Sequence, residues 1–274
     1  MTRQPNTATP DSIGQVYDEF TGIGATAVLG GNIHVGYWDD DHDVPIAEAT
    51  DRITDLVAQR LAPRPDAHLL DVGCGNGFPA VRIARAHDVR VTGITVSRQQ
   101  VAQAQELAAD AGGRASFLFA DAMHLPFDDG SFDGAWAIEA LMHMTEQTRA
   151  LSELHRVVRP GGRLVVTDLC QRQPFTGEDR ALLDGMLRAY EIVDISTPGE
   201  HRARLAEAGW ELLEMTDIGE RVRPSYGHAA AAFRELATSL DAGAAEQITA
   251  AADAMEAFGK HPDTGYVVIT ARRS

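Results

Sequence analysis

Short apolar runs rich in β-branched residues alternate with helical patterns between residues 66 and 170, and this alternation constrains the fold more than any other feature of the chain. Runs of this kind, separated by helices, favour a parallel sheet covered by helices on both faces. The predicted strands are His68–Val72, Val89–Val96, Ser116–Ala120, Phe132–Ile138 and Arg163–Thr167. The predicted helices between them are Pro79–His87, Arg98–Ala111 and Thr145–Val158, with a turn at Pro160–Gly162 before the last strand.

The segments that flank this alternation have patterns of their own. Apolar side chains fall on one face of a predicted helix, Ile46–Leu61, and Pro63 stops that helix. A capping box at Thr197 and Glu200 predicts the start of another helix. The remaining patterns predict helices over Glu178–Tyr190 and Pro198–Ala208, a strand over Trp210–Met215, two helices within residues 218–263 and a last strand over Gly265–Ala271.

Charge and cysteine content exclude several classes of partner and environment. The chain has 40 acidic and 24 basic residues, which gives a formal net charge of −16. Such a field repels phosphate backbones and anionic bilayers, so we expect neither a nucleic acid nor a membrane as partner. The two cysteines, Cys74 and Cys170, make no disulfide framework, and no signal peptide precedes the core, so we expect a cytoplasmic protein.

A glycine-rich run, Asp71-Val-Gly-Cys-Gly-Asn-Gly77, joins the first predicted strand to its helix. Glycines there let the backbone turn tightly and approach a ligand, and the helix start offers free N–H groups. The ligand could in principle be a dinucleotide. However, the spacing is G-x-G-x-G rather than G-x-G-x-x-G, and no acidic residue closes the second strand to bind a nicotinamide-cofactor ribose.

The glycine-rich run resembles the first motif of the class I S-adenosylmethionine-dependent methyltransferases, and four further segments match that family in order and spacing. These segments are Gly93-Ile-Thr-Val-Ser97, Ala120-Asp-Ala-Met-His-Leu-Pro-Phe127, Ser131-Phe-Asp-Gly-Ala-Trp-Ala-Ile138 and Leu154-His-Arg-Val-Val-Arg-Pro-Gly-Gly162. Together with the first motif they cover about residues 66 to 170. Three further segments resemble those of actinobacterial natural-product methyltransferases, such as the sugar O-methyltransferase of rebeccamycin biosynthesis. They are Asn32-Ile-His-Val-Gly-Tyr-Trp38, the Met142-His143 turn and Gly265-Tyr-Val-Val-Ile269.

The resemblance implies a Rossmann-like α/β fold with a seven-stranded sheet of order 3-2-1-4-5-7-6, in which the last strand is antiparallel. It also implies a helical N-terminal lid and helical cap insertions. We read residues 1–12 as a disordered tail and residues 13–274 as a single methyltransferase domain. Within that domain, residues 66–170 would form the cofactor-binding core, and residues 171–200 and 218–263 would form cap segments that contact the substrate.

S-adenosylmethionine, the cofactor that the resemblance implies, needs partners for its charged end and its ribose. Asp71 can accept a hydrogen bond from the ammonium, and the backbone at Gly73 and Gly75 can donate to the carboxylate. Ser97 and Gln100 follow the second strand and can bond to the ribose hydroxyls. Asp71 could instead cap the turn, and Gln100 could be a solvated helix residue.

The adenine and the sulfonium need a different set of groups. Asp121 can accept from the exocyclic amine while the Ala122 backbone donates, although Asp121 could equally cap a turn. His34 is a candidate cofactor contact, and Tyr17 and Trp38 are candidates for a lid over the sulfonium. Aromatic residues of this kind are more often part of the packing, and that alternative stays open.

Methyl transfer to a hydroxyl group calls for a base near the methyl carbon. His143 follows the fourth strand and Asp168 ends the fifth, so His143 is the candidate base and Asp168 the candidate orienter. Glu139 is a second candidate acid–base. The rebeccamycin relative has two adjacent histidines where this chain has Met142 and then His143, which leaves a single base. His143 could also simply contact the cofactor or pack.

The sequence therefore predicts an S-adenosylmethionine-dependent methyltransferase that acts on a small-molecule natural product and releases S-adenosylhomocysteine. We expect an O-methyltransferase with a sugar, polyketide or similar apolar acceptor. The alternatives are a C- or N-methyltransferase, or a cyclase that binds the cofactor without transferring its methyl group. We predict no metal and leave a homo-oligomer open. Candidate substrate contacts are Met142, Met186 and Tyr190.

Overall fold

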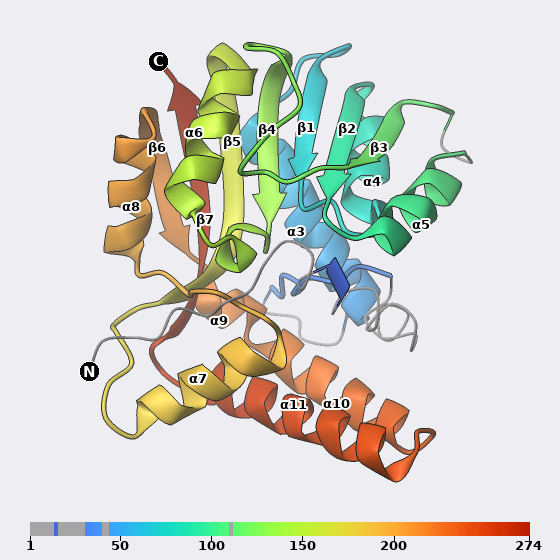
Figure 1. Cartoon of the computed structure of the whole chain (residues 1–274), viewed down its shortest axis with the longest axis vertical. Helices are drawn as coiled ribbons and strands as arrows, with labels where there is room; N and C mark the ends of the chain where they lie inside the picture. Colours follow the sequence, from blue (N-terminus) through green and yellow to red (C-terminus); the bar gives the residue numbers. More distant parts are fainter. Residues whose placement is uncertain (1–13, 16–30, 40–43, 110–111) are drawn as a thin grey trace.

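One seven-stranded sheet forms the centre of the structure, a computed structural model that describes residues 14–15, 31–39, 44–109 and 112–274 (Figure 1). Its order is β3-β2-β1-β4-β5-β7-β6. The first five strands run parallel, and β7 lies antiparallel between β5 and β6, which confirms the predicted topology. The strands are β1 (His68–Val72), β2 (Arg90–Thr95), β3 (Ala115–Phe119), β4 (Phe132–Ile138), β5 (Val158–Gln171), β6 (Trp210–Asp217) and β7 (Thr264–Arg273).

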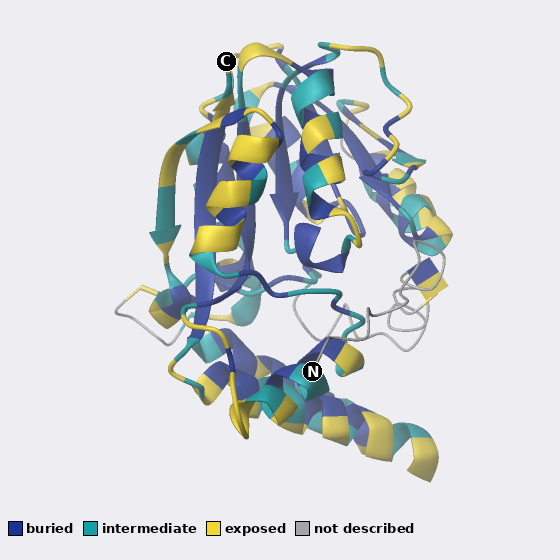
Figure 2. Ribbon diagram, turned by 60° about the vertical axis from the view of Figure 1, so that its left-hand side comes forward, coloured by how far each residue is buried: buried dark blue, intermediate teal, exposed yellow. Residues whose placement is uncertain are grey.

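Helices cover both faces of this sheet, so its central strands are buried, whereas the edge strand β6 and the outer helix faces meet solvent (Figure 2). The helices on one face are α3 (Ile46–Leu61), α4 (Phe78–His87) and α5 (Arg98–Ala109). Those on the other are α6 (Gln147–Val157) and α8 (Pro198–Glu207). The nearly continuous apolar pattern of the central strands follows from this double covering, because these strands have a core on either side.

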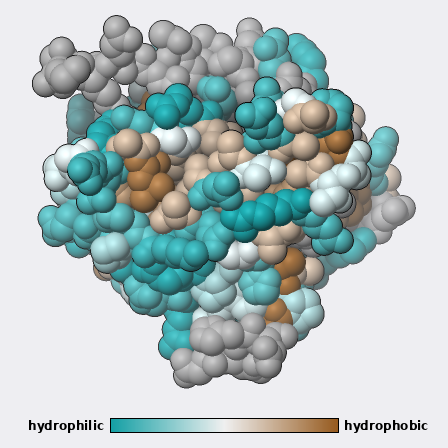
Figure 3. All heavy atoms as spheres, turned by 90° about the horizontal axis from the view of Figure 1, so that it is seen from below, coloured by the Kyte–Doolittle hydropathy of each residue, from teal (hydrophilic) through white to brown (hydrophobic). Residues whose placement is uncertain are grey.

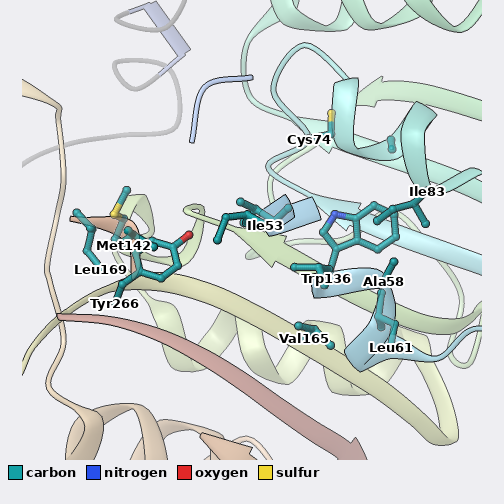
Figure 4. Packing of buried hydrophobic residues seen from close by; sticks show 14 of the residues in the cluster. Ile53, Ala58, Leu61, Cys74, Ile83, Trp136, Met142, Val165, Leu169 and Tyr266 are labelled. Carbon is teal, nitrogen blue, oxygen red and sulfur yellow. The ribbon is translucent and has the colours of Figure 1, made fainter. Parts of the chain in front are cut away.

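The core on the α3 face is centred on the fully buried indole of Trp136 in β4. Ala58 and Leu61 of α3 and Ile83 of α4 surround this ring (Figure 4). The predicted amphipathic face of α3 therefore packs on the sheet. The helix ends where Ala62 adopts a left-handed conformation, directly before the proline that was predicted to stop it.

A third layer lies across the end of the sheet at which the parallel strands terminate (Figure 1). It consists of α7 (Asp179–Ala189), α9 (Gly219–Val222), α10 (Pro224–Ala237) and α11 (Ala242–Lys260). The insertions after β5 and β6 are thus helical, as predicted. Seen from below, the layer shows hydrophilic residues alternating with pale apolar ones, with small strongly hydrophobic areas (Figure 3). No helix within the described ranges is long and apolar enough to cross a membrane.

One local expectation needs correction, and another lies outside the described residues. Pro160–Gly162 is part of β5 rather than a turn before it. The strand accommodates these residues because its pairing with β4 shifts register between Phe132 and Gly134, and Gly161 takes a left-handed φ of 80°. The expected N-terminal lid helix lies mostly on residues 16–30, outside the described residues. The adjoining residues 31–39 form an irregular segment.

The capping box of α8 is present as the sequence predicted. The Thr197 hydroxyl accepts from the Glu200 amide at 3.3 Å, and the Glu200 carboxylate accepts from the Thr197 amide at 2.7 Å. Both bonds satisfy N–H groups that a helix start would otherwise leave without partners.

Candidate active site

A pocket lies at the carboxyl ends of β1 to β4, the edge at which open parallel sheets bind their ligands. It brings together residues that are far apart in the sequence, from the segment before α3 to the start of α6. Its walls are formed by Ile33, His34, Asp71, Gly73, Cys74, Gly75, Asn76, Pro79, Ile94, Thr95, Val96, Gln100, Ala120, Asp121, Ala122, Met123, Ile138, Glu139, Ala140, His143, Met144 and Thr145.

The glycine turn after β1 forms one wall, as predicted. Gly73 and Gly75 have φ values of 72° and 53°, which L side chains rarely adopt. A Cβ on Gly73 would lie 2.6 Å from the Cβ of Ala140, and one on Gly75 would lie 2.7 Å from Cδ1 of Ile33. The backbone at both positions therefore borders the pocket directly, at sites where a side chain would not fit.

Asp71 reaches the same pocket from the end of β1, opposite Trp136 in the pairing with β4. The residue is 2% exposed, and Oδ2 has no hydrogen-bond partner among the described residues. Burial raises the pKa of this carboxyl well above its usual range, and the indole of Trp136 opposes that rise. A buried oxygen without a partner is costly, so this wall is suited to a ligand with a cationic donor.

The end of β2 supplies a polar pair that differs from the predicted one. Gln100 lines the pocket as expected, and its Oε1 accepts from the hydroxyl of Thr95 at 2.8 Å. Ser97 instead caps α5, because its Oγ accepts from the Gln100 amide at 3.0 Å. Thr95, which the sequence analysis missed, stands at the pocket wall. Its position next to the end of the predicted strand Val89–Val96 could have revealed it.

The segment after β3 forms the far wall with Asp121 and Ala122, both as predicted. Oδ1 of Asp121 accepts from the Met123 amide at 2.9 Å, so the carboxylate also fixes the turn. The hydroxyl of Thr145 lies 3.5 Å from Sδ of Met123, which ties this wall to the residues before α6. Asp121 therefore shapes the turn and borders the pocket, and its contact with adenine stays a prediction.

The segment formed by residues 31–38, here called the strap, covers the glycine turn with Ile33 and His34. The His34 ring donates from Nδ1 to the carbonyl of Val35 at 2.9 Å, because that oxygen can only accept. Nε2 is then the basic nitrogen, and it is buried without a partner among the described residues. Burial lowers the pKa of His34 to about 4, so the ring is neutral.

Trp38 is the last residue of the strap, and its contacts differ from those of the predicted lid over the sulfonium. Its Nε1 donates to Oγ of Ser225 at 3.1 Å, and its ring stacks on His228 with centroids 4.7 Å apart. Trp38 therefore anchors the strap to α10 and is fully buried there. Tyr17, the other lid candidate, lies outside the described residues.

His143 lies in η1 (Leu141–His143), the short turn between β4 and α6, and it lines the pocket. Its Nδ1 bonds to the carbonyl of Glu191 at 3.1 Å, which again makes Nε2 the basic nitrogen. Burial lowers the pKa of His143 to about 4. The ring is therefore held in a neutral state that can accept a proton.

Asp168 does not make the contact with the imidazole that we predicted. Its Oδ2 accepts from the Met142 amide and its Oδ1 from the Leu169 amide, each at 3.1 Å. The carbonyl of Glu191 takes the place beside Nδ1 of His143 instead. Asp168 thus fixes the backbone of η1 from the last part of β5.

Glu139 follows β4 directly and borders the pocket. Its Oε1 accepts from the Val35 amide at 2.8 Å and from the hydroxyl of Tyr266 at 3.0 Å. Burial raises the pKa of this carboxyl to about 7. The backbone φ of 48° is in the left-handed region, unusual for a residue other than glycine.

The candidate substrate contacts Met142, Met186 and Tyr190 are packing residues in the structure. Met142 lies beside Leu169 and Tyr266 in the core (Figure 4). Met186 is 3% exposed, and the hydroxyl of Tyr190 donates to the carbonyl of Ala251 at 3.0 Å, which joins α7 to α11. No cluster of three or more possible metal ligands occurs in the part of the chain that the structure describes.

Comparisons with known proteins agree with this fold. A family model described as a methyltransferase domain matches residues 70–166. The chain is 40% identical over 276 residues to the O-methyltransferase resE of Aspergillus sclerotiorum, with 100% of both chains covered. It is 40% identical over 268 residues to the 27-O-demethylrifamycin SV methyltransferase of Amycolatopsis mediterranei, with 97% of this chain and 98% of that protein covered. The solved structure of the cyclase SpnF matches with a TM-score of 0.86 at 35% identity, with 100% and 99% covered.

Proposed function

Because the chain belongs to the class I S-adenosylmethionine-dependent methyltransferases, we propose that it methylates a hydroxyl group of a small, largely apolar natural product. The observation that carries the proposal is the set of buried polar groups that face one pocket beside a glycine cradle. Asp71 and His34 each present an acceptor atom there without a partner among the described residues.

These residues fit S-adenosylmethionine. Asp71 would accept from the ammonium, the amides around Gly73 and Gly75 would bond to the carboxylate, and Gln100 would bond to the ribose. Asp121 and the Ala122 amide would hold the adenine edge. When bound, the cofactor supplies a methyl carbon that its sulfonium has already activated.

The chain's own residues would then prepare the acceptor. His143 would take the hydroxyl proton at Nε2, since the Glu191 carbonyl holds the proton of the neutral ring at Nδ1. Asp168 would keep η1 in place through the Met142 amide. The strap would keep water from the pocket and hold the reacting groups in line. This orientation of the reacting groups contributes much of the rate enhancement of a displacement reaction.

The nature of the acceptor is inferred from the relatives. The names of two of them, each 40% identical over nearly the whole chain, specify O-methyl transfer, and one names a demethylated rifamycin as substrate. A hydroxyl acceptor also suits a neutral histidine at the pocket wall. We therefore favour an O-methyltransferase over a C- or N-methyltransferase.

A second candidate is a cyclase that binds the cofactor without using its methyl group. It is favoured by the likeness to the cyclase SpnF at 35% identity over the whole chain. The two functions share a cofactor pocket and differ in whether S-adenosylhomocysteine is released.

Incubation with methyl-labelled S-adenosylmethionine and a panel of hydroxylated polyketides, glycosides and terpenoids tests the proposal. We expect label in an ether-extractable product and an equal amount of S-adenosylhomocysteine. Cofactor binding with conversion of a polyene substrate, but with no S-adenosylhomocysteine, would favour the cyclase instead. Label on carbon or nitrogen would refute the choice of acceptor while leaving methyl transfer intact.

A further inference from the structure

The middle of the strap is attached to the sheet through one side chain. The ends of the strap have other anchors: Asn32 donates to the hydroxyl of Thr50 at 2.9 Å, and the Gly36 amide donates to Oγ of Ser225 at 2.9 Å. Between them stand the pocket-lining residues Ile33 and His34. In the described part of the chain, the side-chain hydrogen bond that reaches this middle part from the sheet is Val35 N–H to Glu139, at 2.8 Å.

Glu139 is itself held from two directions. Its amide donates to the carbonyl of Thr167 on β5 at 2.8 Å, and this bond helps to keep the residue in its left-handed conformation. Its Oε1 also accepts from the hydroxyl of Tyr266, a fully buried residue of β7. That hydroxyl lies 3.1 Å from Oγ1 of Thr167. The carboxyl group is thus fixed to β5 and β7 before it meets the strap.

Val35 connects Glu139 to a residue of the pocket wall, His34. The Val35 amide bonds to Glu139, and the Val35 carbonyl accepts from Nδ1 of His34. Val35 therefore links the two groups: its amide donates to the carboxyl group of Glu139, and its carbonyl fixes the orientation and the tautomer of the His34 imidazole. Ile33, one residue further back, sits over Gly75 of the cradle.

We propose that Glu139 is a positioning residue, which holds Ile33 and His34 of the strap against the bound cofactor and takes no proton from the acceptor. The inference rests on the proposed function, because it assigns the pocket to S-adenosylmethionine. It differs from the role of second acid–base that the sequence suggested for Glu139.

The two roles make opposite demands on the side chain. A base must be a carboxylate, whereas both hydrogen bonds at Oε1 need only an acceptor oxygen. A glutamine has such an oxygen in the same place and matches the neutral acid in shape. Glu139→Gln should therefore preserve positioning and destroy basicity, while Glu139→Ala should destroy both.

The experiment measures the dissociation constant for S-adenosylmethionine by calorimetry and kcat at saturating cofactor. Glu139→Ala should weaken cofactor binding by about tenfold or more, and Glu139→Gln should stay within about threefold of the wild type in both quantities. Tyr266→Phe is the matched control, since it removes the other partner of Oε1 and leaves Val35 bonded. It should also stay within about threefold.

Hydrogen exchange at residues 31–38 gives a readout that is independent of turnover. The Val35 amide should exchange faster in Glu139→Ala than in Glu139→Gln or Tyr266→Phe, with the melting temperature measured in parallel to verify folding. Loss of about 100-fold or more of kcat in Glu139→Gln at unchanged affinity would make Glu139 a base and overturn the inference. Unchanged affinity and exchange in Glu139→Ala would also overturn it. Failure of the wild type itself to bind the cofactor would refute the proposed function instead.

Discussion

At the scale of single residues, two buried histidines have the same hydrogen-bonding arrangement. His34 and His143 each give the Nδ1 proton to a backbone carbonyl, that of Val35 and that of Glu191 respectively. Burial lowers the pKa of each ring to about 4, so both are neutral and basic at Nε2. The pocket therefore has two proton-free acceptor nitrogens at neutral pH, and burial of the rings is the cause.

His143→Ala should lower kcat by about 10²- to 10⁴-fold if the acceptor is a hydroxyl, which is the usual contribution of a general base. Cofactor affinity should change by less than about tenfold. In the wild type, kcat should be level above about pH 5 and fall as the pH drops through about 4, because protonation removes the lone pair at Nε2. Initial rates at saturating cofactor in a pH series check both points.

Near-complete turnover in His143→Ala would contradict this account of the base. So would a wild-type rate that falls already near pH 6.5, the ordinary pKa of an imidazole. Either result would leave proximity and orientation as the main sources of rate.

At the scale of elements, the reactive residues depend on how neighbouring strand ends support one another. Asp168 of β5 is 1% exposed and accepts a hydrogen bond from the Met142 amide. This bond holds η1, the turn that contains His143, in place. Glu139 at the end of β4 supports the strap in the same way. In both cases an acidic side chain acts on a neighbouring backbone.

Asp168→Ala should lower kcat by up to about 100-fold, since a shift of η1 misplaces the imidazole. It should also destabilise the fold by about 1–3 kcal/mol, because a buried amide loses its acceptor. Asp168→Asn, which keeps one acceptor oxygen for the Met142 amide and loses the one that accepts from the Leu169 amide, is the matched control and should lose less. The shape of the pH profile should be unchanged in both variants, and a shifted profile would mean that Asp168 acts on the ring itself.

Sequence periodicity predicted the elements well because local patterns encode them. The predicted bounds of α3, β1 and β4 agree with the structure residue for residue, and the glycine turn stands where the motif placed it. Partners across the fold were harder to predict. The carbonyl that bonds His143 is 48 residues away, and the serine that anchors Trp38 is 187 residues away. Local sequence patterns do not encode such contacts. The predicted contacts of Asp168 with the imidazole and of Trp38 with the sulfonium were therefore wrong.

At the scale of the whole molecule, the carboxyl ends of the parallel strands and the strap line one pocket. The helical layer lies across the same end of the sheet (Figure 1). The sheet supplies the glycine cradle and the acidic end of β1. The strap covers the cradle, and α10 anchors the strap through Ser225. The account's central claim is that this pocket binds S-adenosylmethionine.

Calorimetric titration of S-adenosylmethionine into the wild type and into Gly75→Val tests that claim most directly. The wild type should bind one equivalent with a micromolar dissociation constant, about −7 to −8 kcal/mol. Gly75→Val should bind none while keeping its circular dichroism spectrum, because a side chain there would occupy the cradle. No heat and no thermal stabilisation of the wild type, or equal binding by a folded Gly75→Val, would contradict the account.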